Sequence, residues 1–199
     1  LNLVRSLALE KRLVTMQVDL APDRRLHASG GQARNLYQEA VRTMATRAKP
    51  EGGALQNVVE RLIGDANQAS AQAGRSAEAI IQERLAPLRD YNGGFDFVTV
   101  ISAFCRGHAE GNEQLKSDAV RWLRGEFTTK TDAQRALGVR TIVGDDTVYD
   151  HLKLLSGFVQ AAGYAGLFVI LDEMVNLYKM QHSVSRQQNY EQILRILND

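Results

Sequence analysis

The sequence has one cysteine, no long apolar run and almost no net charge. Each of these three features argues against a class of protein. Cys105 alone cannot form an internal disulfide or a cysteine-rich zinc site, and we interpret it as a buried, small hydrophobic residue in a reducing compartment. No apolar run approaches the ~20 residues that cross a bilayer, so a cytoplasmic protein without membrane contact is expected. Lys and Arg number 24 against 23 Asp and Glu, which gives no overall reason to expect nucleic acid or an acidic partner but leaves room for a local basic patch.

A hydrophobic content of 44% in 199 residues is enough for a packed core. The sequence opens at Leu1 within a run of helical apolar spacing that has no N-cap before it. We therefore expect a fragment of a larger protein.

The stretch 166–173, Gly-Leu-Phe-Val-Ile-Leu-Asp-Glu, organises the chain. Its continuous apolar run predicts a strand buried on both faces, as in a parallel sheet covered by helices, with Asp172 and Glu173 at the carboxyl edge where such sheets bind ligands. One interpretation is a Walker B element, in which Asp172 holds Mg²⁺ and Glu173 polarises the attacking water. The other is a purely structural strand running into a helix, with Asp172 as the N-cap.

A second strand is predicted over 13–19, after an opening helix, and it ends near Asp19. Arg24, Arg25 and His27 follow in a loop, either as a solvated turn or as an anion contact. His182 is interpreted as a solvated loop residue. Arg186 could reach phosphate, although a surface salt bridge is the alternative.

From 30 to 163 the pattern is helical, far longer than an ordinary crossover, so it predicts a lid or an interaction module. Helices are expected over 32–48, 55–73, from Ser76 through Leu85, over 95–109 and 113–123, after a cap at Thr131 or Asp132, and from Asp146 to Gly163. The large aromatic residues of this region are interpreted as core, with a stacking platform for bases as the alternative; they are Tyr37, Phe95, Phe97, Phe104, Trp122 and Phe158.

After Glu173 we expect a short helix, a loop over 181–185 and a last helix over 187–197. Ser185 is its expected cap, and the residues expected to face inward are Tyr190, Ile193, Leu194 and Leu197. No GxxxxGK[ST] phosphate loop occurs anywhere in the sequence.

The segments 13–20, 163–173, 176–178 and 185–191 resemble the P-loop ATP-binding proteins associated with BREX phage-defence systems. The resemblance implies ATP and Mg²⁺ as cofactors, Asp172 as the Mg²⁺ residue, Glu173 as the catalytic base, and an ATPase that drives or switches a multi-protein, defence or DNA-associated assembly. The chain departs from the family's pattern by lacking the Walker A loop and the later sensor and arginine-finger strands. By itself it should therefore bind nucleotide poorly.

The fold class predicted in this way is α/β and predominantly helical, with a partial P-loop, AAA-like parallel sheet. Residues 1–29 would begin the core, 30–163 would be a helical insertion, and 164–199 would hold the Walker B strand and the helices after it. Strand 13–19 should pair in parallel with 167–172, whose other edge would stay open and favour self-association. The competing hypothesis is a non-catalytic helical module for protein interaction; binding of DNA has no support from the charge.

Overall fold

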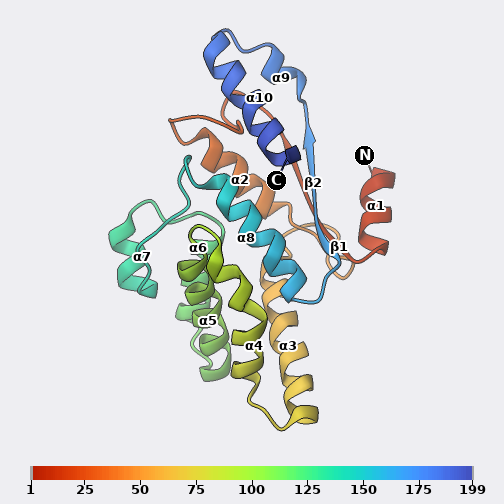
Figure 1. Ribbon diagram of the computed structural model, residues 1–199, viewed down its shortest axis with the longest axis vertical. Helices are drawn as coiled ribbons and strands as arrows, with labels where there is room; N and C mark the ends of the chain where they lie inside the picture. Colours follow the sequence, from red (N-terminus) through yellow and green to blue (C-terminus); the bar gives the residue numbers. More distant parts are fainter. Residues whose placement is uncertain (1, 199) are drawn as a thin grey trace.

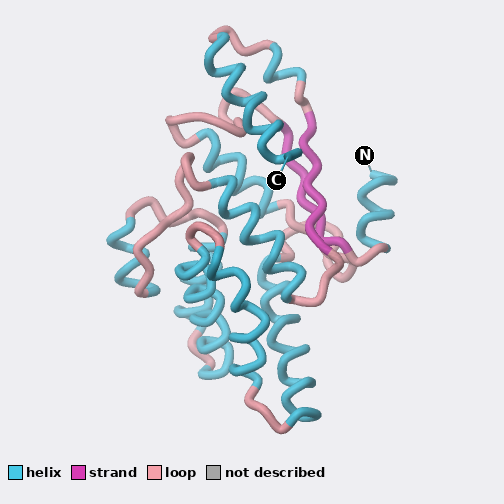
Figure 2. The backbone as a smooth tube through the Cα atoms, in the orientation of Figure 1, coloured by secondary structure: helices cyan, strands magenta, loops and turns pink. Residues whose placement is uncertain are grey.

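The computed structural model describes residues 2–198. In chain order the elements are α1 (Asn2–Glu10), β1 (Leu13–Asp19), α2 (Gln32–Arg42), α3 (Leu55–Ala73), α4 (Ala77–Leu85), the 3-10 helix η1 (Ala86–Asp90), α5 (Gly94–Glu110), α6 (Glu113–Leu123), α7 (Lys130–Leu137), α8 (Val148–Ala161), β2 (Gly166–Asp172), α9 (Val175–Tyr178) and α10 (Ser183–Asn198). Figures 1 and 2 show the two strands side by side, with α3 to α6 extending below them. The prediction of a predominantly helical α/β protein with a small parallel sheet is confirmed.

The two strands form a parallel pair, in register along their whole length until Asp19 lies opposite Asp172. This pairing, between segments far apart in the sequence, is the predicted one. On its other side, β1 meets an extended segment: the Thr15 N–H donates to the Ala45 carbonyl at 2.9 Å, and the Ala45 N–H donates back at 2.8 Å. Among residues 2–198, no strand covers the outer edge of β2. The open edge that the sequence predicts is therefore present in the described part of the chain.

The same extended segment ends α2 early. The predicted helix ran to Ala48, whereas α2 ends at Arg42. The hydroxyl of Thr43 accepts a hydrogen bond from the Gln17 N–H at 3.0 Å and donates to the Gln17 carbonyl at 2.7 Å. The apolar residues Met44 and Ala45 could continue the helix or form an extended segment equally well. Their position beside β1 makes the segment extended.

Helices cover one face of the sheet, where α2 packs on β1 and α8 packs on β2. α1 lies on the other side of the strands and meets β1 only near its own C-terminal end, where Ala8 and Leu9 are buried (Figure 1). One face of β1 places Val14, Met16 and Val18 in the core. The prediction that β2 is buried on both faces is wrong at Val169, which is 37% exposed and lines an open apolar hollow with Leu152 of α8 and Ile196 of α10. α2 and α8 lie within 30–163, so this segment shares the core of the sheet; its description as an insertion stays a prediction.

The aromatic residues of the helical segment are core residues with one exception. Phe97 makes edge-to-face contacts with Trp122 at 6.3 Å and with Phe158 at 5.9 Å between ring centroids. Tyr37 and Phe104 are also fully buried, as predicted. Phe95 is different, because its side chain is 71% exposed. The prediction of a core position is wrong for this residue.

Side-chain caps place several helix ends. Ser76 caps α4 as predicted. The predicted cap of α7 at Thr131 or Asp132 is wrong, because the Thr129 hydroxyl accepts the Asp132 N–H at 3.1 Å and donates to the Asp132 carboxylate at 2.6 Å. Thr129 is thus the N-cap, and the Asp132 carboxylate holds its hydroxyl rather than the Thr129 N–H that a full capping box would engage.

The last helix differs most from its prediction. α10 begins at Ser183, so Ser185 lies inside the helix and is not its cap. Two residues expected to face inward are exposed, Leu194 at 56% and Leu197 at 74%. The fully buried residue of this helix is Asn189, a polar side chain that the apolar pattern could not select.

Candidate functional site

The carboxyl ends of the two strands form the candidate site. The Leu20 N–H donates to the Asp172 carbonyl at 3.0 Å, which extends the parallel ladder one residue beyond β1. Asp19 and Asp172 are neighbours in the register, so two carboxylates end the two strands at the same level. In open α/β sheets this edge is where ligands bind.

Beyond β2 the chain turns sharply at Glu173. This residue has a φ of +55°, in the left-handed region that a residue with a Cβ rarely adopts. Its N–H donates to Oδ1 of Asp172 at 2.8 Å, and its carbonyl accepts the Asn176 N–H at 2.9 Å. α9 begins only at Val175, after Met174, and has no side-chain cap. The interpretation of Asp172 as the N-cap of the following helix is therefore wrong.

The two carboxylates of this turn have no basic side chain paired with them in the described part of the chain. Asp172 is half-buried and Glu173 is exposed. A strained, non-glycine backbone that holds an unpaired carboxylate at a sheet edge is typical of functional sites.

Two asparagines fasten the chain after β2 to the loop after β1. Nδ2 of Asn176 donates to the Leu20 carbonyl at 2.8 Å. Asn189 accepts the His27 N–H at Oδ1 and donates from Nδ2 to the His27 carbonyl, both at 3.0 Å, and its Nδ2 also donates to the Ser185 carbonyl at 2.8 Å. α9 and α10 are thus held against the sheet edge by main-chain contacts.

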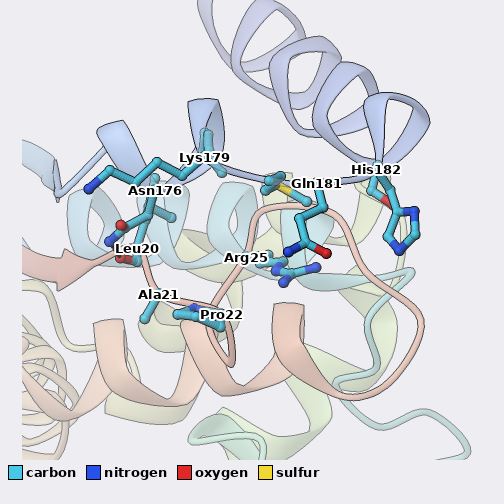
Figure 3. A pocket seen from close by; sticks show the side chains of 11 residues that line it. Leu20, Ala21, Pro22, Arg25, Asn176, Lys179, Gln181 and His182 are labelled. Carbon is cyan, nitrogen blue, oxygen red and sulfur yellow. Dashed lines mark hydrogen bonds between the residues drawn. The ribbon is translucent and has the colours of Figure 1, made fainter.

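A pocket of about 530 Å³ lies between the loop after β1 and the α9–α10 connection. Its basic side chains are Arg25, Lys179 and His182, and none of its lining residues is acidic. Figure 3 shows Arg25 and Gln181 facing each other, with His182 at one end and Lys179 at the other. The arrangement is suited to an anion, the alternative that the sequence left open for Arg25.

The predicted site residues are only partly brought together. Asp172 and Glu173 lie at the same sheet edge as the basic pocket but do not line it. Arg186 also does not line it, and its Nη1 donates to the Met180 carbonyl at 3.0 Å. A contact of Arg186 with phosphate stays a prediction.

Burial makes Cys105 unsuited to nucleophilic chemistry, as expected. It raises the pKa of the Cys105 thiol to about 12, so the thiolate is not formed near neutral pH. In the described part of the chain, no helix combines the length and apolar character that a membrane span requires. No group of three or more histidine, cysteine or acidic side chains there could hold a metal ion.

A family model described as BREX system ATP-binding protein BrxC/D matches residues 1–199. The chain belongs to this family. The BrxC/D family consists of ATP-binding proteins of the BREX phage-defence system, so membership makes ATP the ligand to expect and other BREX subunits the partners to expect. No curated protein and no solved structure is similar enough to the chain to count as a match.

Three features of this BrxC/D chain escaped prediction from the sequence. Asp19 was considered only as a strand end, although parallel pairing with a strand that ends in Asp172 was enough to place the two together. Arg25 and His182, which both line the pocket, come from segments more than 150 residues apart, so no local pattern joins them. The hydrogen bonds of Asn189 with the main chain of His27 had no sequence signal beyond a polar residue within an amphipathic helix.

Proposed function

We propose that this chain carries the Mg²⁺-binding and water-activating side of an ATPase site, with Asp172 as the metal residue and Glu173 as the general base. The observation that supports this proposal best is the turn at Glu173. This turn presents two unpaired carboxylates at the carboxyl edge of a parallel strand pair. To do so, Glu173 adopts a left-handed backbone conformation that is strained for a residue other than glycine.

Asp172 suits a magnesium ion that is shared with a nucleotide. Its Oδ1 accepts the N–H of the next residue, which fixes the carboxylate and leaves Oδ2 for a cation. Mg²⁺ in nucleotide sites needs only one or two carboxylates, because phosphates and water complete its shell. The lack of a three-ligand cluster among residues 2–198 is thus compatible with the proposal. Bound with ATP, the ion would neutralise charge on the phosphates.

Glu173 suits the role of base because it is exposed and has no ion-pair partner in the described part of the chain. A free carboxylate can accept a proton from an attacking water, and the fixed backbone keeps it at the sheet edge. Its main-chain bonds to Asp172 and Asn176 would hold it in place while the proton is transferred.

The phosphate-binding side of the site would come from residues outside 1–199, since no GxxxxGK[ST] loop lies within them. The open edge of β2 offers a place for a further strand. α1 presents an apolar face of Leu3, Val4 and Leu7 that is exposed here. We propose that these surfaces receive the phosphate-loop segment, and that ATP binding then switches a multi-protein BREX assembly. Pairing of two β2 edges is the alternative, and it predicts dimers.

The test uses a protein in which this chain is joined to the proposed phosphate-loop segment. Glu173→Gln should keep ATP binding, measured by calorimetry with Mg²⁺, and slow hydrolysis by roughly 10²- to 10⁴-fold. Glu191→Gln is the matched control, because Glu191 is an exposed glutamate of α10 whose contact is with Gln187. Hydrolysis at the wild-type rate in Glu173→Gln would contradict the assignment of the base.

The second candidate function, a non-catalytic interaction module, is favoured by one observation, the exposed Phe95. If neither the chain 1–199 nor the extended protein binds ATP, this function becomes the leading one. The two functions are not exclusive, since the module would lie in the helices remote from the sheet edge.

A further inference from the structure

A groove in the helical part of the chain lies between α4, α5 and the end of α7. Its volume is about 310 Å³, and Val98 and Leu137 contribute apolar side chains to it. Phe95, at the start of α5, stands beside them with 71% of its side chain exposed. The groove is also lined by the polar side chains of Gln82, Thr99 and Ser102. An aromatic ring left in water on its rim lacks the burial that its neighbours on α5 achieve, and such positions commonly belong to binding surfaces.

The charge of this groove is of one sign. Its lining includes Arg89 and Arg106 and no carboxylate. Arg106 has no hydrogen-bond or ion-pair partner within residues 2–198. Arg89 donates from Nη2 to Oε1 of Gln82 at 2.6 Å, which orients its guanidinium without neutralising it.

Two carboxylates of the neighbouring segments, those of Asp96 and Glu83, are engaged elsewhere. Oδ2 of Asp96 accepts the N–H groups of Arg140 and Thr141 and the Thr141 hydroxyl, at 2.7 to 3.0 Å. Glu83 pairs with Arg75 at 2.7 Å. The two arginines of the groove therefore keep unneutralised donors next to an apolar floor.

Another surface pocket shows the contrast. The pocket beside α6 and α7 contains Arg121 and Arg135, but it also contains Asp118 and Asp132, which pair with them at 3.1 and 3.6 Å. The arginines of this pocket are neutralised by carboxylates of the same pocket, so the pocket needs no acidic ligand. The groove at Phe95 lacks this internal compensation.

We propose that the groove at Phe95 binds an acidic segment of a partner protein that carries a bulky apolar side chain. The apolar side chain packs on Phe95, Val98 and Leu137, and flanking carboxylates accept from Arg89 and Arg106. Arginine and aromatic residues are the types that dominate binding at protein interfaces. This inference does not depend on the ATPase proposal, because the groove shares no residue with the carboxylates of the sheet edge.

Single-stranded nucleic acid is the less suited ligand. Proteins that bind single-stranded nucleic acid line up a series of cations along its phosphate backbone. This groove has only two arginines, beside the apolar side chains of Val98 and Leu137. The net charge of +1 adds no general attraction for phosphates.

The experiment is selection of a displayed library of random 12-residue peptides on the whole chain. Enriched sequences should be rich in Asp and Glu around a Leu, Phe, Ile or Trp. Resynthesised peptides, measured by fluorescence anisotropy, should bind at least tenfold more weakly to Phe95→Ala and to Arg106→Glu. Both positions are exposed, so these variants should fold, which circular dichroism checks. The matched controls are Tyr178→Ala and Arg47→Glu, an exposed aromatic residue and an exposed arginine outside the groove, which should bind as the wild type does.

Each other outcome overturns the proposal. No enrichment, or enrichment of neutral or basic peptides, would show that the groove does not select an acidic segment. Equal binding by wild type and Phe95→Ala would place the peptide elsewhere. Binding of a 12-nucleotide oligo(dT) that Phe95→Ala abolishes, without binding of acidic peptides, would identify a base-stacking surface. If the peptide experiment failed, the comparison of ATP hydrolysis between the wild type and Glu173→Gln would still stand. The two proposals can therefore be refuted separately.

Discussion

Replacement of Asn189 by alanine tests whether a single buried amide holds α10 on the rest of the protein. The side chain is 0% exposed and forms two hydrogen bonds with the main chain of His27, one in each direction. Its loss removes both and leaves the two main-chain groups of His27 without these partners. At about 1 kcal/mol for each bond and further desolvation of the groups left behind, the expected loss is about 2 to 3 kcal/mol.

Urea unfolding measures this loss. Trp122, the only tryptophan, is buried in the helical core and reports global unfolding by its fluorescence. With a slope of about 2 kcal/mol per molar urea, the midpoint should fall by about 1 to 1.5 M. Hydrogen exchange in α10 separates local release of the helix from global unfolding.

Two further variants sharpen the result. Asn189→Asp keeps the acceptor for the His27 N–H but turns an oxygen toward the carbonyls of His27 and Ser185, so it should destabilise at least as much as alanine. Gln187→Ala removes only an exposed contact with Glu191 and should change stability by no more than about 0.5 kcal/mol. If Asn189→Ala also stayed within about 0.5 kcal/mol of the wild type, and exchange in α10 did not change, the reasoning would be refuted.

Burial lowers the pKa of His151, whose Nε2 has no partner among residues 2–198, so below pH ~6.5 the unfolded state binds more protons than the folded state. Stability should therefore fall from about pH 7 to 5 and His151→Phe should flatten that part of the urea-midpoint profile; parallel profiles for the two proteins would contradict this. A Cβ at Gly94 would lie 1.8 Å from the Leu88 carbonyl oxygen, so Gly94→Ala should lower stability by about 3 kcal/mol or more. Gly64, in the interior of α3, has no atom within 4 Å of such a Cβ. Gly64→Ala should therefore increase the free energy of unfolding by up to about 1 kcal/mol and raise the melting temperature. A similar melting temperature for both variants would refute the packing argument.

Local signals account for the elements that were predicted well. α3 and α6 have the predicted bounds, and α6 begins after Asn112, whose side chain accepts the Leu115 N–H. The two strands were predicted from their apolar runs, their parallel pairing was implied by the family resemblance, and the register confirms it.

The failures occur where a distant contact overrides a local pattern. Thr43 ends α2 because its hydroxyl bonds to a strand residue 26 positions earlier. α10 buries the polar side chain of Asn189 because this side chain bonds to a residue 162 positions earlier. Asp172 and Glu173 were predicted as site residues from their position after an apolar strand, whereas the left-handed backbone of Glu173 had no sequence mark such as glycine.

The pairing of β1 with β2 has a consequence for synthesis on the ribosome. Leu13 precedes its partner Gly166 by 153 residues, and at 5 to 20 residues per second β1 would wait about 8 to 30 s for β2 to be made. During that interval the extended segment at Ala45 can already pair with the opposite edge of β1, since it follows Thr15 by only 30 residues. The early partner would shield one side of an aggregation-prone strand, and the nascent chain should remain dependent on chaperones until residue 172 has left the exit tunnel.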